Sequence, residues 1–353
     1  MRTRKLHRRI KSVALGNLFG LILSCGSLAF GQLPDRVIVE SKTRTISPVA
    51  GDFAFDVTRH TVPLNEIRGG GPPKDGIPAL VDPAFVSPAN ARELRPRELV
   101  LGVHLGGFSK AYPIRILNWH ELVNDQIGGR PILVTWCPLC GSGVVYDPVM
   151  DGERVLFGVS GLLYQRNLLM YDRKTVSLWS QLGMQSAAGP LAGSTLPILP
   201  VGLTTWEDWK GRFPDTAVLS FRTGYNRDYN RDPYRDLPMN RQEAAAVFVG
   251  EAVKLYVLSE LAKAEGVVED VVGGKRLRLH YDRQERRLSI QSETEEAVKH
   301  FVAFFADLRA FYPTAERFQL PRARSDSAPG NYLYLWDPTA IQDCVGIDSP
   351  RIQ

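Results

Sequence analysis

Two blocks of this sequence carry the same landmarks in the same order, and this repetition constrains the fold more than any other feature. A Lys-x-Tyr motif at 110–112 recurs 144 positions later at 254–256. The block 123–129, with an aspartate followed by Gly-Gly, recurs 145 positions later at 268–274. A strand-like run follows in both copies. The sequence therefore predicts two related halves, of which the second is shorter, with a chance likeness as the alternative.

Local patterns favour an α+β, strand-rich fold within this repeated organisation. Runs rich in β-branched and aromatic residues, bounded by glycine or proline, predict strands. Apolar residues at three- and four-residue spacing predict helices. The expected strands are 99–105, 109–114, 131–136, 143–146, 155–159, 168–171, 176–179 and 276–281, and the expected helices are 116–125, 205–213 and 298–312. The expected organisation is a signal peptide over 1–31, an irregular Pro- and Gly-rich N-terminal extension over 32–86, a first half with the site over 87–235, a second half over 236–327 and a tail over 328–353.

The first 31 residues predict export. Six basic residues and no acidic residue precede position 31, and an apolar run over 13–23 follows the basic ones. This run is too short to span a bilayer and has the form of a secretory signal. Ala29-Phe-Gly31 predicts the cleavage site, and lipoprotein processing at Cys25 is the alternative. We therefore expect a periplasmic or extracellular protein.

Charge excludes two classes of partner. Of the 43 Lys and Arg residues, six lie in the signal, which leaves 37 against 38 acidic residues. A nearly neutral protein has no electrostatic attraction to nucleic acid or to anionic lipid. No later segment is long and apolar enough to predict a transmembrane span. A protein partner in the periplasm is left open, and the sequence does not indicate a substrate.

Cys137-Pro-Leu-Cys140-Gly is the chemically most distinctive segment. Proline fixes φ at the second position, and the glycine after the second cysteine tolerates a left-handed conformation. Both sulfurs are therefore expected on one side of a tight turn, an arrangement that suits soft metal ions. Cys137 and Cys140 are the predicted metal ligands, with copper ranked before zinc because the protein is expected to be exported and the site is rich in sulfur.

His120 is the best candidate for a third ligand, or for a base that deprotonates the cysteines. On the predicted helix 116–125 it lies at the flank of the apolar face, so it is expected to point inward. Whether it reaches the cysteines is left open, and a core histidine bonded to backbone is the alternative. Met170 is a weaker ligand candidate, and Glu121 and Asp125 are expected on the outer, solvated face of the helix.

Two other functions fit the same cysteine pair. Cys137 and Cys140 would be catalytic if they cycled between dithiol and disulfide. The fold would not be thioredoxin-like, because Gly141-Ser-Gly143 predicts a turn and a strand where thioredoxin has a helix N-terminus. The third interpretation is a structural or binding module in which the cysteine pair stabilises the fold through a bound metal ion or a disulfide bond. The role of Cys344 is not indicated, since three cysteines after cleavage do not make a disulfide framework.

Seven motifs spread over the first half can be compared with known families. They are Ile77-Pro-Ala-Leu80 with Asp82-Pro83, Lys110-Ala-Tyr-Pro113, Leu117-Asn-Trp-His120-Glu-Leu-Val-Asn-Asp125, Val134-Thr-Trp-Cys137-Pro-Leu-Cys140-Gly-Ser-Gly143, Phe157-Gly-Val-Ser-Gly161, Met170-Tyr-Asp-Arg173 and Ser177-Leu-Trp-Ser-Gln181. Together with the repeated halves, this set resembles the domain-of-unknown-function family 3179. The resemblance is close over 77–225 and looser to about 315.

The resemblance implies an architecture and a site but no reaction. His120, Cys137 and Cys140 lie within the family's motifs, which supports their selection here. The chain departs from the family pattern at Gln165-Arg-Asn167, where the family often has Asn-Ser-Asp. The resemblance therefore does not assign an acidic functional residue to positions 165–167 of this chain. The tail from Ala328 lies outside the resemblance.

Overall fold

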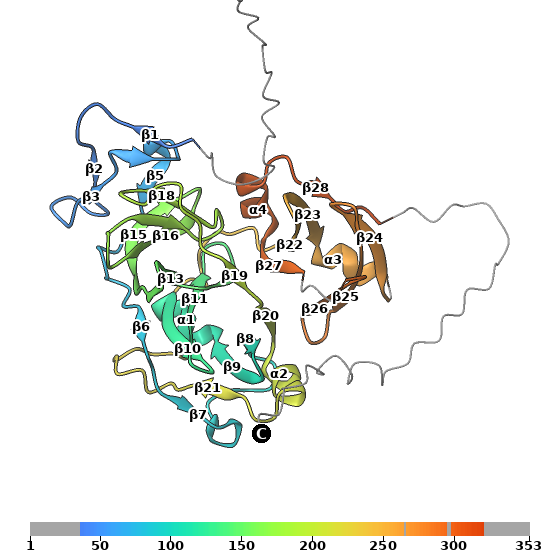
Figure 1. The fold of residues 1–353 in the computed structure, drawn as a ribbon. Helices are drawn as coiled ribbons and strands as arrows, with labels where there is room; N and C mark the ends of the chain where they lie inside the picture. Colours follow the sequence, from blue (N-terminus) through green and yellow to red (C-terminus); the bar gives the residue numbers. More distant parts are fainter. Residues whose placement is uncertain (1–35, 265, 295–297, 321–353) are drawn as a thin grey trace, which may run out of the picture. The chain divides into compact units, whose positions relative to one another are not determined.

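Strands dominate the computed structural model, which describes residues 36–264, 266–294 and 298–320 (Figure 1). The expected signal peptide with Cys25, and the tail with Cys344, lie outside these residues. The described residues up to Phe318 belong to one compact unit. No helix within the described ranges is long and apolar enough to cross a membrane.

Two sheets, built from the first half and from the segment that precedes it, form the surroundings of the cysteine turn. The seven-stranded sheet has the order β1 (Ile38–Val39), β4 (Arg59–His60), β18 (Gln185–Ala188), β17 (Leu178–Ser180), β16 (Asn167–Asp172), β15 (Phe157–Tyr164) and β5 (Ile67–Gly69). The five-stranded sheet that carries the turn has the order β19 (Ile198–Leu199), β12 (Ser142–Tyr146), β11 (Arg130–Cys137), β10 (Leu122–Ile127) and β6 (Leu80–Val81). Strand β11 is buried from Ile132 to Cys137, because its apolar residues face other elements on both sides.

Two further sheets have matching strand orders. One is β20 (Gly202–Thr205), β8 (Leu99–Leu105), β9 (Phe108–Pro113), β21 (Ala217–Leu219) and β7 (Phe85–Val86). The other is β27 (Lys299–Phe304), β22 (Glu243–Val249), β23 (Ala252–Val257) and β28 (Glu316–Arg317). In both, a central hairpin has an antiparallel strand on one side, β20 or β27, and on the other side β21 or β28 pairs parallel to the second strand of the hairpin. The first sheet has one further edge strand, β7, next to β21. The four strands that these two sheets have in common therefore share one order and one pattern of pairing.

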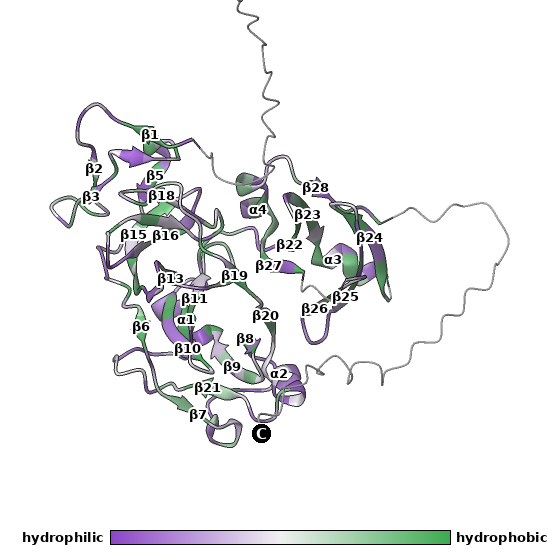
Figure 2. Ribbon diagram, viewed as in Figure 1, coloured by the Kyte–Doolittle hydropathy of each residue, from purple (hydrophilic) through white to green (hydrophobic). Residues whose placement is uncertain are grey.

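The remaining elements are short. A three-stranded sheet contains β24 (Val268–Val272), β25 (Lys275–Asp282) and β26 (Arg287–Ser292), and two pairs are β2 (Thr45–Ile46) with β3 (Phe55–Asp56) and β13 (Val149–Met150) with β14 (Glu153–Arg154). The helices are α1 (Ile114–His120), α2 (Trp206–Arg212), α3 (Leu258–Leu261) and α4 (Phe305–Phe311), with 3₁₀ turns at Leu64–Glu66, Pro88–Asn90 and Ala262–Ala264. Helix α2 is largely hydrophilic (Figure 2) and is anchored by its buried Trp206 and Trp209.

Two of the expected helices are shorter than predicted. Helix α1 ends at His120, and Glu121 has φ 57°, which turns the chain into β10. Residues 299–304 form β27, which pairs with β22, and only Phe305–Phe311 is helical. In both places strand pairing satisfies the backbone hydrogen bonds, and this tertiary context overrides the helical spacing of apolar residues.

The segment 32–86 was predicted to be irregular, yet its described part contributes to a sheet. Strands β1 and β4 lie at one end of the seven-stranded sheet, and β5 lies at the other. Each of these strands has only two or three residues, which explains why no periodic pattern marked them. The predicted hairpin over 99–114 and the predicted strand over 131–136 are confirmed.

Candidate thiol site

The turn between β11 and β12 holds both cysteines at its base. Cys137 pairs with Ser142 across the hairpin, and the backbone N–H of Cys140 donates to the carbonyl of Cys137 at 3.2 Å. Gly141 has φ 56°, and a Cβ there would lie 2.5 Å from a ring carbon of Phe304. Only glycine therefore permits both the backbone conformation and the close packing of the turn.

Both cysteines are buried and free. Cys137 is 1% exposed and Cys140 0%, and no disulfide joins them. The neighbouring Cys137 and burial raise the pKa of Cys140 well above its ordinary value. Cys140 therefore keeps its proton more strongly than a free cysteine does. The tight turn thus brings the two sulfurs together, as predicted from the spacing.

Cys140 is surrounded by polar groups on the side away from Cys137. Its sulfur lies 3.7 Å from the carbonyl oxygen of Arg166, and it also forms a hydrogen bond with Asn167. Asn167 is held in place because its amide donates to Gln181 at 2.8 Å and its carbonyl accepts from the backbone of Leu182 at 2.9 Å. This region is the one where the chain departs from the family pattern, and here an amide rather than an acid faces the thiol.

A carboxylate from a distant part of the chain completes the surroundings of Cys140. Asp307, in α4, accepts a hydrogen bond from the Cys140 thiol, and its Oδ1 lies 3.9 Å from Nε of Arg166. Its side chain is 5% exposed, and burial raises its pKa above the ordinary value. Asp307 belongs to the second half, so the site is not confined to the first half as the sequence predicted.

Glu121 and Tyr234 lie on the Cys137 side of the pair. The Tyr234 hydroxyl donates to Oε1 of Glu121 at 3.1 Å. Burial, then Glu121, then Cys137 raise the pKa of Tyr234, which shows that the phenol is close to both groups. Glu121 is 6% exposed, so the expectation of a solvated outer face was wrong. The error arose because the helix was predicted to continue to residue 125, whereas it ends at His120, one residue before Glu121.

Asp125 was also expected on a solvated face and is in fact 3% exposed. It lies in β10, where it accepts hydrogen bonds from Lys110 at 2.8 Å and from the hydroxyl of Tyr112 at 2.7 Å. The second half contains the same arrangement, with Lys254 and Tyr256 donating to Asp270.

The Glu121→Gln variant is expected to change how stability depends on pH. Burial raises the pKa of Glu121 from 4.5 to about 7 in the folded protein. The folded state therefore holds this proton more tightly, and stability falls as pH rises from about 4.5 to about 7, by at most about 3 kcal/mol. The variant should lose this fall and should exceed the wild type in stability at pH 8. Urea unfolding at pH 5 and pH 8 measures both.

An exposed residue gives the control for this comparison. Glu251→Gln removes a carboxylate that is exposed to solvent, and it should leave the pH dependence of the wild type unchanged. Equal pH slopes in the wild type and in Glu121→Gln would show that burial of the Glu121 carboxylate does not govern its titration.

The side chain of His120 forms hydrogen bonds with residues other than the two cysteines. Its Nδ1 donates to the carbonyl of Pro78 at 2.8 Å, and its Nε2 accepts from the hydroxyl of Tyr229 at 2.7 Å. Burial lowers the pKa of its imidazole, which favours the neutral form. Both ring nitrogens are therefore engaged, and neither is directed at the cysteines. This is the arrangement of the alternative considered from the sequence, a core histidine.

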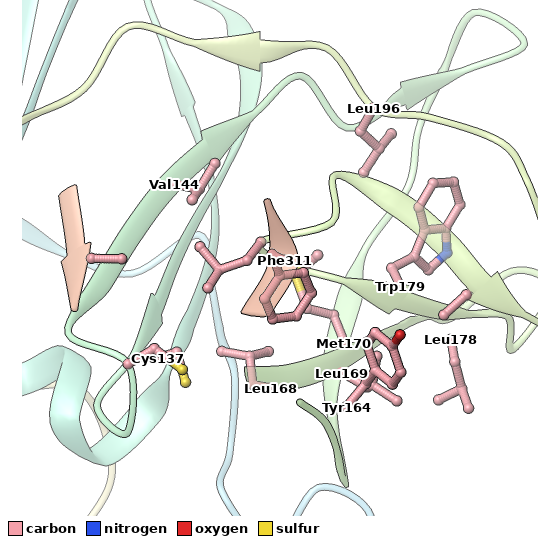
Figure 3. Packing of buried hydrophobic residues seen from close by; sticks show 14 of the residues in the cluster. Cys137, Val144, Tyr164, Leu168, Leu169, Met170, Leu178, Trp179, Leu196 and Phe311 are labelled. Carbon is pink, nitrogen blue, oxygen red and sulfur yellow. The ribbon is translucent and has the colours of Figure 1, made fainter. Parts of the chain in front are cut away.

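Met170 lies in the core of the seven-stranded sheet, opposite Val159 on one neighbouring strand and Trp179 on the other. Figure 3 shows its side chain among the labelled core residues, apart from that of Cys137. Of the predicted ligands, Cys137 and Cys140 therefore lie together, and Met170 lies apart from them.

The side chains around the cysteines can be compared with the ligands that zinc and copper require. Structural zinc takes four ligands and catalytic zinc at least three from the protein. Among the described residues, no group of three or more His, Cys, Asp and Glu side chains is placed to hold a metal ion. The residues present therefore do not fit a zinc site. Two soft thiolates alone fit only a monovalent copper ion of low coordination number.

A pocket of about 490 Å³ lies beside the turn. Trp136, Pro138 and Gly141 of the turn form part of its lining, and Tyr234 forms part of another wall. Sequence reasoning did not find Tyr234, Asp307 or Asn167, because no spacing links them to the cysteines. Asn167 alone lay within a segment that had been compared with the family pattern.

Comparison with known protein families matches residues 74–329 to the family described as "Protein of unknown function (DUF3179)". This confirms the resemblance found in the sequence motifs. Comparison with curated proteins and with solved structures gave no match.

Proposed function

Since the chain belongs to the DUF3179 family, whose description names no reaction, we propose its function from the site: a thiol–disulfide oxidoreductase in which Cys137 and Cys140 alternate between dithiol and disulfide. One observation carries this proposal. Two free thiols lie together in one buried turn, one of them bonds a buried carboxylate, and no third metal ligand accompanies them among the described residues.

The order of the two sulfurs follows from their surroundings. Cys140 keeps its proton because the neighbouring Cys137 and burial raise the pKa of its thiol. The Cys137 thiolate therefore attacks first, forming a bond to one sulfur of a partner disulfide and releasing the other sulfur as a thiolate, which takes a proton from water. The product is a mixed disulfide between Cys137 and the partner.

Cys140 then completes the exchange. The Asp307 carboxylate accepts the Cys140 proton, since it is bonded to that thiol and its raised pKa makes it a better base. The Cys140 thiolate attacks the Cys137 sulfur, the bond to the partner breaks, and the partner leaves as a second thiol. One partner disulfide is thereby reduced to two thiols while Cys137 and Cys140 are oxidised to one disulfide.

Thiol mapping in redox buffers tests this function. The protein is equilibrated in buffers with increasing ratios of oxidised to reduced glutathione, alkylated, and mapped by mass spectrometry. We expect reversible loss of both thiols together, with a Cys137–Cys140 disulfide as the product. Thiols that stay reduced at every ratio, or a disulfide that dithiothreitol does not reduce, would count against the proposal.

Monovalent copper bound by the two thiolates is the second candidate. The observation in its favour is the pair of soft donors held together in a sheltered place, which satisfies an ion that accepts few ligands. Metal analysis of protein purified without chelators separates the two candidates. Stoichiometric copper that is lost in Cys137→Ser favours copper binding, and metal-free protein with a reversible disulfide favours redox exchange. If Cys137→Ser unfolds the protein, the pair is a structural clip.

Two features of the sequence support further parts of this proposal. The basic and apolar N-terminal segment supports export to the periplasm, where disulfide exchange takes place outside the reducing cytoplasm. N-terminal sequencing of the exported protein should show cleavage after Gly31. The matching strand orders of the two halves, each with a Lys-Tyr-Asp cluster, support an internal duplication.

A further inference from the structure

A short hairpin turn covers the sulfur of Cys140. Cys137 and Cys140 are at most 1% exposed, so a partner disulfide reaches them only when the structure opens locally. The backbone carbonyl of Arg166 accepts a hydrogen bond from the Cys140 thiol at 3.7 Å, while the Arg166 side chain is 54% exposed. Arg166 thus contacts the sulfur with its backbone and the solvent with its side chain.

Gln165 and Arg166 are the two central residues of this turn, which joins β15 to β16 and is called here the β15–β16 turn. Tyr164 pairs with Asn167 on either side of them. Their φ angles are 49° and 66°, in the left-handed region that tight two-residue hairpin turns require. Glycine and asparagine suit this region, whereas glutamine and arginine are disfavoured there by their β-carbons. The closed turn therefore depends on contacts with the rest of the protein.

Polar contacts with other elements supply this support. The Gln165 amide donates to Oε2 of Glu66 at 2.6 Å, and Nε of Arg166 lies 3.9 Å from Oδ1 of Asp307. The Cys140 thiol adds its bond to the Arg166 carbonyl. Of these contacts, the one from the thiol involves a sulfur that changes its bonding during thiol–disulfide exchange.

The residues on both sides of the turn are fixed independently of it. The ring of Tyr164 packs edge-on against that of Phe311, with centroids 5.8 Å apart. Asn167 is fully buried, and its side chain is bonded to Gln181 and to the backbone of Leu182. The turn can therefore move while strands β15 and β16 stay in place.

Oxidation of the cysteine pair removes the hydrogen bond from the thiol to the turn. When Cys137 and Cys140 form a disulfide, two electrons pass to the partner disulfide, and the Cys140 sulfur gives up its proton. A sulfur without a proton is no longer a hydrogen-bond donor to the Arg166 carbonyl. The closed turn thus loses one of its contacts in the disulfide form.

We propose that the redox state of the thiol pair controls the β15–β16 turn, which is closed over the dithiol through the bond from Cys140 to the Arg166 carbonyl and opens more often over the disulfide. This inference rests on the redox function proposed above. The disulfide form is then more accessible to a thiol reductant, which returns the pair to the dithiol and so completes the cycle.

Deuterium uptake measured by mass spectrometry compares the two redox forms. The protein is reduced with dithiothreitol or oxidised with oxidised glutathione, and uptake is followed in peptides that contain Gln165 and Arg166. We expect uptake about two- to tenfold faster in the disulfide form, the effect of losing one hydrogen bond. The exposed Arg173 and Lys174, which follow the other end of β16, are the matched control and should take up deuterium equally in both forms.

Two variants separate the hydrogen bond from the redox chemistry. Cys140→Ala removes the donor, so its β15–β16 turn should show the faster uptake without any oxidation. Cys140→Ser keeps a donor at the same place and should retain the slow uptake of the reduced wild type. Equal uptake in the two variants, or in the two redox forms of the wild type, would overturn the control of the turn and leave the redox function standing. Failure of the wild type to form a disulfide would instead refute the redox function and, with it, this inference.

Discussion

Asp125→Ala is expected to destabilise the protein by about 3 to 5 kcal/mol, and the matching change Asp270→Ala by clearly less. Asp125 binds Lys110 at 2.8 Å and the buried Tyr112 hydroxyl at 2.7 Å, and its side chain is 4% exposed. Removing it leaves the fully buried Tyr112 phenol without its acceptor, and it leaves the carbonyl of Gln126 as the remaining hydrogen-bond acceptor of the Lys110 ammonium. Breaking a buried pair in this way costs more than the pair contributes, because the remaining charge keeps its desolvation penalty.

The second half provides the matched comparison. Asp270 binds Lys254 and the Tyr256 hydroxyl in the same geometry, but its side chain is 16% exposed. The carboxylate that Asp270→Ala removes is thus less buried, and the Lys254 ammonium that remains keeps an ion pair with Glu316 at 3.6 Å. Urea unfolding of both variants, with the exposed Asp215→Ala as the control, measures the difference. A loss at Asp270→Ala as large as that at Asp125→Ala would show that exposure does not set the cost.

The sequence predicted those parts of the fold whose signals are local. The hairpin over 99–114 has two strand-like runs joined by Gly106-Gly107, and β11 is a continuous run of buried residues. These patterns lie within a few residues of each other, so no distant partner is needed to recognise them.

Element boundaries were wrong where pairing with another strand decided the structure. Residues 299–304 have helix-like apolar spacing, but they pair with β22, which lies about fifty residues earlier in the chain. Likewise, 122–125 continue the pattern of α1, yet they pair with β11. The error at this second place also misplaced Glu121, because an extended helix would have turned its side chain outward.

The candidate site was predictable only in its cysteines. Cys137 and Cys140 lie in one turn, so their spacing alone brings the sulfurs together. Tyr234 and Asp307 reach the same place from irregular chain and from α4, and their sequence neighbours carry no motif. His120 illustrates the reverse: it has the right residue type and a nearby position, but Pro78 and Tyr229 bind its two nitrogens.

Exchange activity is expected to respond differently to removal of each thiol. Cys137→Ser should abolish reaction with a disulfide, by a factor on the order of a thousand or more, because it removes the attacking sulfur. Cys140→Ser should still react once and should then accumulate as a mixed disulfide through Cys137, since no second thiol releases the partner. The asymmetry follows from the retained proton on Cys140, since Cys137 and burial raise the pKa of that thiol.

Intact mass after incubation with oxidised glutathione measures both outcomes. Cys140→Ser should gain one glutathione that maps to Cys137, and Cys137→Ser should gain none at Cys140. Asp307→Asn serves as a third variant, because loss of its carboxylate should slow release of the mixed disulfide while leaving its formation intact. If Cys140 is the residue that becomes glutathionylated, the assignment of the two sulfurs is reversed.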